Sequence, residues 1–176
     1  MNYKLFKLNI KIYLMHLFGR FKHDAKVNNF SSERLESPNI LIIFPVKDDL
    51  VTESMECVSK IISSHEKNGS SFSFVIDKNK SGKISLFSVR VIPMEIKKEK
   101  FLINSVSILN QLKYKSFDVV VNLNVEFNSD IDMLIERINA KYKIGFVSKY
   151  SDLFYNIQVN WDESKSRFKS IINILE

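Results

Sequence analysis

Short runs rich in isoleucine and valine alternate with segments of helical period, and this alternation constrains the fold more than any other feature of the chain. The first run is NILIIF at 39–44, between Pro38 and Pro45, and the strongest is FDVVVNL at 117–123. Continuous apolar runs of this length are typical of strands buried on both faces of a parallel sheet. Parallel strands need crossover connections, which are usually helices. We therefore expect an α/β fold of Rossmann type, with a mostly parallel sheet and helices on both faces.

The remaining strand and helix signals follow one another in an order that fits βαβ units. Ser129 and Asp132 have the spacing of a capping box, which predicts that a helix begins at this point. Gly and Pro number only 4 and 3 in the 176 residues, so few breakers define the element boundaries. Further strands are expected near 72–77, 88–93, 142–147 and 156–161, and helices near 50–66, 98–113, 130–140 and 168–175.

The N-terminal arm, residues 1–37, differs from the rest of the chain, residues 38–176, which we expect to form the α/β domain. The formal net charge is +6, and residues 1–35 carry +5 of it. The body is therefore nearly neutral and lacks the basic stripe that a nucleic-acid backbone would need, so no nucleic acid is expected as a partner.

The most apolar part of the arm is KLFKLNIKIYLMHLFGRFK at 4–22. Lysines and polar residues interrupt it too often for a spanning helix or a signal peptide. Three alternatives stay open: a basic helix on an anionic membrane surface, a helix packed on the body or on a partner subunit, and a poorly ordered arm. We expect a cytoplasmic location, at the inner face of the membrane if this segment binds lipid.

No residue pattern indicates a metal site or a bound cofactor. The single cysteine, Cys57, falls among the apolar positions of a predicted helix and is interpreted as a buried hydrophobic residue. Neither GxGxxG nor GxxxxGK[ST] occurs, and no His or Cys converges by spacing on the acidic pair Asp48 and Asp49. We expect no metal and no cofactor.

Ligands of open α/β sheets bind beyond the carboxyl ends of the strands, and polar loops follow the two most apolar strands at 45–49 and 124–130. Asp48 and Asp49 suit either helix capping or contact with a ligand, including a general-base role toward a sugar hydroxyl. Asn124 suits either a loop cap or a hydrogen bond to a sugar. The candidate ligand-binding residues are Lys47, Asp48, Asn124 and Asn128, and the candidate catalytic residue is Asp49.

Other polar and aromatic residues also allow two interpretations. Asn122 lies inside an apolar strand, so its amide must find hydrogen-bond partners. An aromatic and polar group near the C-terminus suits packing around the last helix or stacking against a sugar. This group consists of Tyr150, Asp152, Tyr155, Asn156 and Trp161.

Taken in order, these motifs resemble glycosyltransferase family 9, the heptosyltransferases of lipopolysaccharide assembly. ILIIFPVKDDLVTES at 40–54 is similar to the first strand of the family and the loop that follows it. FDVVVNL is similar to the family's "YDxVIDL" strand, and KIGF at 143–146 to its "RIGF/Y" strand. The resemblance covers about residues 39–161.

The resemblance implies a GT-B arrangement of two Rossmann-like halves, with catalysis in the cleft between them. The family's N-terminal half contacts the acceptor and its C-terminal half binds the nucleotide sugar. Only the first half is matched here. The resemblance places the catalytic Asp at Asp49, but the preceding Gly of the family is Asp48 and the Asp of "VIDL" is Asn122.

Two functional hypotheses follow. In the first, the chain is a heptosyltransferase-like domain without autonomous catalysis, acting as a glycan- or partner-binding module in cell-envelope polysaccharide assembly. In the second, it is the acceptor-binding half of a split glycosyltransferase that transfers a sugar from a nucleotide donor. The expected partner is a chain that carries the donor half, or a second copy of this chain.

Overall fold

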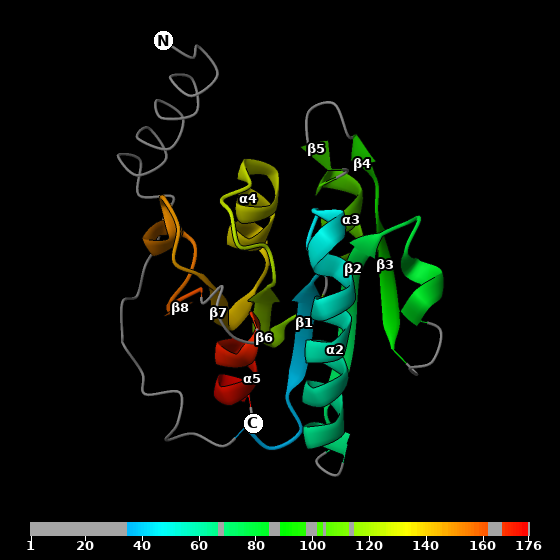
Figure 1. Ribbon diagram of the computed structural model, residues 1–176, viewed down its shortest axis with the longest axis vertical. Helices are drawn as coiled ribbons and strands as arrows, with labels where there is room; N and C mark the ends of the chain where they lie inside the picture. Colours follow the sequence, from blue (N-terminus) through cyan, green and yellow to red (C-terminus); the bar gives the residue numbers. More distant parts are fainter. Residues whose placement is uncertain are drawn as a thin grey trace.

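A six-stranded parallel sheet forms the centre of the computed structural model (Figure 1). The strand order is β3-β2-β1-β6-β7-β8, and every neighbouring pair is parallel. The chain thus enters in the middle of the sheet and winds outward in both directions, as in the Rossmann fold. The structure describes residues 35–66, 69–84, 89–97, 102–103, 105–112, 115–161 and 167–175.

The strands of the sheet lie where the apolar runs predict them. β1 is the most buried, and its residues from Ile40 to Ile43 have no exposed surface. A strand covered on both faces is apolar at every position, and this explains the uninterrupted run of isoleucine and leucine. The bounds are β1 Asn39–Ile43, β2 Ser71–Asp77, β3 Arg90–Met94, β6 Phe117–Asn122, β7 Ala140–Phe146 and β8 Ile157–Val159.

Helices cover the sheet on both faces, which confirms the predicted layers. On one face, Ile40 and Ile42 of β1 pack in a cluster with α2 (Asp48–His65) and α5 (Lys169–Leu175), and the two helices touch each other. Figure 1 shows both helices on the near side of the sheet. On the other face, Leu41 and Ile43 pack with α3 (Ser105–Leu112) and α4 (Ser129–Arg137). Short 3-10 helices lie at Ser81–Ile84 and Ser151–Leu153.

The helix expected at 98–113 is wrong in its first half. Leu102–Ile103 form a short strand, β5, which pairs antiparallel with β4 (Ile96–Lys97), and α3 begins only at Ser105. The run of apolar residues before Ser105 resembles one face of a helix, and a two-residue strand is too short to show a period of its own.

The helix after β6 differs slightly from the prediction at both ends. Its N-cap is Asn128, whose side chain accepts hydrogen bonds from the backbone N–H groups of Asp130 and Ile131. Asp132 Oδ2 in turn accepts one from the N–H of Asn128, so the reciprocal arrangement exists but starts one residue before Ser129. The helix ends at Arg137, because Ile138 is already extended and leads into β7.

The basic segment at 4–22, and the rest of the arm up to residue 34, lie outside the described residues. Within the described part of the chain, no helix is both long and apolar enough to cross a membrane.

Candidate functional site

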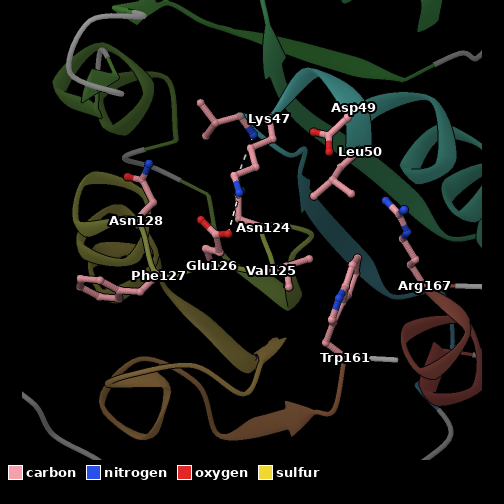
Figure 2. A pocket seen from close by; sticks show the side chains of 11 residues that line it. Lys47, Asp49, Leu50, Asn124, Val125, Glu126, Phe127, Asn128, Trp161 and Arg167 are labelled. Atoms are coloured by element: carbon pink, nitrogen blue, oxygen red, sulfur yellow. Dashed lines mark hydrogen bonds and ion pairs between the residues drawn. The ribbon is translucent and has the colours of Figure 1, made fainter. Parts of the chain in front are cut away.

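A cleft of about 700 Å³ lies at the carboxyl edge of the sheet, beyond β1, β6 and β8 (Figure 2). Its volume falls within the range of about 300–1,000 Å³ typical of small-molecule sites. The carboxyl edge of the sheet is therefore open at this place, where the ligands of open α/β sheets bind. The described lining comes from the loops after β1 and β6, the start of α2, and two residues of the segment between β8 and α5. It consists of Val46, Lys47, Asp49, Leu50, Asn124, Val125, Glu126, Phe127, Asn128, Trp161 and Arg167.

Four of the five predicted site residues line this cleft, namely Lys47, Asp49, Asn124 and Asn128. The two polar loops therefore do meet, because β1 and β6 are neighbours and end at the same edge. Asp48 is not part of the lining, and its carboxylate forms an ion pair with Lys80.

Asp49 lies in the first turn of α2 with its side chain exposed at the cleft. The N-cap of α2 is Lys47, so neither acidic residue occupies the cap position. Both carboxylates instead face the positive end of the helix dipole from within its first turn. Among the residues that the structure describes, none forms a hydrogen bond or ion pair with the Asp49 carboxylate, which leaves this group available to a ligand.

Asn124 holds the two loops together. Its Oδ1 accepts a hydrogen bond of 2.9 Å from the N–H of Val46, and its Nδ2 donates to the carbonyl of Phe44 at 3.2 Å. Nδ2 also donates to Oδ1 of Asn122 at 2.8 Å. Of the two roles predicted for Asn124, the structure therefore shows the loop-holding one. The Asn128 amide likewise caps α4.

A buried polar network lies behind this loop contact. Nδ2 of Asn122 donates to the hydroxyl of Tyr155 at 2.6 Å, and that hydroxyl donates to Asp132 Oδ1. The amide of Asn122, predicted to need partners, thus finds them in Tyr155 and Asn124. Burial raises the pKa of Asp132 to about 6, although its hydrogen bonds from Tyr155 and from the backbone of Asn128 act in the opposite direction. Burial and the neighbouring Asp132 carboxylate raise the pKa of Tyr155 well above its usual range.

The two cationic residues in the described part of the lining, Lys47 and Arg167, already have carboxylate partners. Lys47 Nζ lies 2.6 Å from Glu126 Oε1, so this ion pair joins the loops after β1 and β6. Arg167 Nε lies 3.5 Å from Oε2 of Glu53 on α2, and the backbone N–H of Arg167 donates to Glu53 Oε1 at 2.8 Å. The guanidinium also lies over the ring of Trp161, 6.0 Å from its centroid.

Trp161 is one of two aromatic residues in the described lining of the cleft, together with Phe127. Its ring meets Phe146 of β7 at a centroid distance of 5.3 Å and Phe168 at 5.7 Å, both close to perpendicular. These contacts hold the half-buried indole against the N-terminal end of α5. Of the two roles considered for this group, packing around the last helix is thus observed for Trp161. The same residue also lines the cleft.

The other members of the aromatic and polar group do not join Trp161. Tyr155 is buried in the network beneath α4, and Tyr150 packs against Phe127 at 5.2 Å. Asn156 bridges the backbone of β7, accepting from the N–H of Lys143 and donating to the carbonyl of Lys141. Tyr150, Tyr155, Asn156 and Trp161 are thus close in sequence but serve different parts of the fold.

Arg167 and Glu126 complete the site and were not singled out from the sequence. Glu126 belongs to the polar loop after β6, so its position at the sheet edge was the available signal. Arg167 reaches the cleft only because α5 packs beside α2, and no local pattern marks it.

The described residues contain no group of three or more His, Cys, Asp or Glu side chains that could hold a metal ion. Cys57 is buried, as predicted, and burial raises the pKa of its thiol to about 12. A thiol of that pKa is almost entirely protonated at neutral pH and is a poor nucleophile.

Among solved structures, the chain is similar to E. coli heptosyltransferase WaaC with ADP, with a TM-score of 0.59 and 17% identity over 78% of this chain and 45% of that one. WaaC with ADP-2-deoxy-2-fluoro heptose gives the same TM-score and identity over 78% and 47%. The glycosyl transferase family 9 protein from Veillonella parvula DSM 2008 gives 0.55 and 17% over 81% and 43%. No family model and no curated protein sequence matches the chain.

These similarities show that the fold is that of the glycosyltransferases which the sequence motifs resemble. The chain spans less than half the length of each of these three proteins. At 17% identity the likeness concerns the fold, and function has to be argued from the cleft itself.

Proposed function

We propose that this domain binds a glycan in the cleft at the carboxyl edge of its sheet and does not transfer a sugar on its own. The observation that carries the proposal is the meeting of two groups in one cleft on a glycosyltransferase-like fold: the Asp49 carboxylate, which has no partner among the described residues, and the fixed indole of Trp161. The setting proposed for this binding is cell-envelope polysaccharide assembly, the setting of the family that the sequence resembles.

The chemistry of the lining supports a sugar ligand. A carboxylate accepts hydrogen bonds from hydroxyl groups, and an aromatic ring offers apolar surface to the C–H groups of a sugar ring. Polar and charged side chains share the described lining with apolar ones such as Leu50, Val125 and Trp161, so hydrogen-bonding groups and apolar surface lie together.

Asp49→Asn provides the test, with Asp48→Asn as the matched control. Both variants remove one negative charge from the first turn of α2, but only Asp49 lines the cleft. We expect Asp49→Asn to weaken binding of glycan fragments by about tenfold, as the loss of a charge-assisted hydrogen bond of ~1.4 kcal/mol would do. Asp48→Asn should bind as the unmodified chain does. Equal effects of the two substitutions would contradict the proposal.

Turnover of nucleotide sugars by the chain alone should stay at background in the same preparation. Clear transfer to an acceptor, abolished by Asp49→Asn, would show that the domain is an enzyme by itself.

One observation favours a second candidate, the acceptor-binding half of a split glycosyltransferase. Asp49, where the family resemblance places the catalytic Asp, lines the cleft and has no described partner. In this role its carboxylate would accept the proton of the attacking acceptor hydroxyl. A donor-half chain that co-purifies with this one, and transfer activity that is lost in Asp49→Ala, would support it. Self-association without such a chain would favour the homo-oligomer instead.

Contact between residues 4–22 and an anionic membrane is proposed from the sequence alone. Binding to vesicles that contain anionic lipid, but not to neutral vesicles, would support it. Replacement of Lys4, Lys7 and Lys11 by Gln should then release the protein.

A further inference from the structure

We infer that the cleft selects a sugar ring without negative charge, neutral or amine-bearing, over a phosphorylated or carboxylated one. The inference rests on the proposed function, that the cleft binds a glycan, and adds which chemical class of glycan it accepts.

The first argument is the charge balance of the lining. Among the described residues, the positively charged side chains of the lining are Lys47 and Arg167 and the negatively charged ones are Asp49 and Glu126, so their formal charges cancel. A site for a phosphate needs an excess of positive charge or of N–H donors directed at the ligand. The described residues that line this cleft carry no such excess of positive charge.

The second argument is that both cations are already engaged. Lys47 is paired with Glu126 at 2.6 Å, and Arg167 with Glu53 at 3.5 Å and with the face of Trp161. An anionic group that approached either cation would compete with a carboxylate already in place, and it would lie next to that carboxylate. A neutral ring needs no displacement of either pair.

The third argument concerns the start of α2. The N-terminus of a helix is a common position for a phosphate, because its free N–H groups and its dipole favour negative charge. Here Asp48 and Asp49 already supply that charge from the first turn. A bound phosphate would meet the like charge of Asp49, whereas a hydroxyl could donate to this carboxylate and an ammonium group could pair with it.

Trp161 also offers the apolar surface against which an uncharged sugar ring can pack. The edge contacts of Trp161 with Phe146 and Phe168 limit its motion, so little conformational entropy is lost when a sugar packs on it. Figure 2 shows Trp161, Leu50 and Asp49 around the same cleft, which gives apolar surface and a hydrogen-bond acceptor together.

The chain carries its own probe for the test, since Trp161 is the only tryptophan in the sequence. The full chain would be titrated with methyl glycosides of several neutral hexoses, with the corresponding 2-amino sugars, and with the 6-phosphates of the same hexoses. Inorganic phosphate would be a further probe. We expect saturable changes in Trp161 fluorescence with the first two groups, and binding at least about tenfold weaker with the phosphates.

Glu126→Gln tests the electrostatic cause. The substitution leaves Lys47 without its carboxylate partner, so the ratio of hexose-6-phosphate affinity to hexose affinity should rise by about tenfold, as expected when one unit charge near an anion is removed. Glu95→Gln is the matched control, because Glu95 forms a similar exposed pair with Lys78 at 3.5 Å outside the cleft. It should leave the ratio unchanged.

Different results would overturn the selectivity and the proposed glycan binding. Tighter binding of the phosphorylated sugars than of the neutral ones would overturn the selectivity and leave glycan binding intact. An absence of any fluorescence change with every sugar, charged or uncharged, would overturn the proposed function and the selectivity with it.

Discussion

The hydroxyl of Tyr155 donates a buried hydrogen bond to the carboxylate of Asp132, which lies 23 residues earlier in the chain. The same hydroxyl accepts from Asn122 on β6, and Asp132 also accepts from the N-cap of α4. One phenol thus joins β6, α4 and the segment before β8 beneath the cleft. The stability of this region should therefore depend on the ionisation of Asp132.

The first prediction is a pH dependence due to Asp132. Its folded-state pKa of about 6 exceeds its ordinary value of 3.8, so the folded protein binds this proton more tightly than the unfolded chain does. The stabilising contribution is present below about pH 4 and is lost as the pH rises through about 6. The shift corresponds to roughly 3 kcal/mol. Urea unfolding at a series of pH values measures it.

Asp132→Asn isolates this contribution from that of other groups. The free energy of unfolding of the unmodified chain, minus that of Asp132→Asn, should fall between pH 4 and pH 7. Asp130→Asn removes a carboxylate from the same helix outside the network and serves as the control. Parallel profiles for the unmodified chain and Asp132→Asn would show that the carboxyl is not perturbed.

The second prediction concerns Gly145 in the KIGF segment. A Cβ at this position would lie 2.6 Å from Cε1 of Tyr155, a ring fixed on its other side by the buried network. Gly145→Ala should destabilise the fold by about 1–3 kcal/mol, as overpacking of a core does. A Cβ at Gly82 meets nothing within 4 Å, so Gly82→Ala should change the urea midpoint little. Equal midpoints for both variants would argue against this packing.

The third prediction uses the single cysteine. Cys57 is buried and the pKa of its thiol is raised to about 12, so both access and ionisation oppose reaction with a disulfide reagent. We expect labelling of the native chain to be slower than that of the unfolded chain by orders of magnitude, and to follow the unfolding equilibrium as urea is added. Rapid labelling in the absence of urea would contradict the burial of this helix face.

The strands and the layers of the fold could be predicted because each depends on residues next to one another in sequence. β1 and β6 are buried on both faces, so each of them is marked in the sequence by one continuous apolar run. The pair β4 and β5 could not be predicted, because two residues in each strand carry no period. The residues of β5 were therefore assigned to the following helix.

The candidate site likewise contains residues that could be predicted from local sequence and residues that could not. Lys47 and Asp49 could be predicted, because the loops that follow buried parallel strands must lie at one edge of the sheet. The sequence indicates that Asn122 needs partners, but not that Tyr155 is one of them or that Tyr155 in turn donates to Asp132, since three separate elements must come together. Arg167 depends on the packing of α5 beside α2, which no local pattern reveals.

The fourth prediction tests the amide that joins the two loops of the cleft. Asn124→Ala removes the acceptor of the Val46 N–H and the donor to the Phe44 carbonyl, so the loop that carries Lys47 and leads to Asp49 loses its attachment to the loop after β6. The fold should lose about 1–3 kcal/mol, the usual cost of leaving partly buried polar groups without partners. Amide hydrogen exchange should rise at residues 44–49 before it rises elsewhere.

Asn156→Ala is the matched comparison for this loop contact. Asn156 also bridges two backbone groups, the N–H of Lys143 and the carbonyl of Lys141, but its hydrogen bonds are exposed and lie outside the cleft lining. Water can replace these bonds, so its loss should cost less and should leave exchange at 44–49 unchanged. If Asn124→Ala left the same segment as protected as before, the loop would be held by its other contacts, above all by the ion pair between Lys47 and Glu126. An exposed pair of this kind contributes only about 0–1 kcal/mol, so we expect the amide to be the stronger of the two attachments.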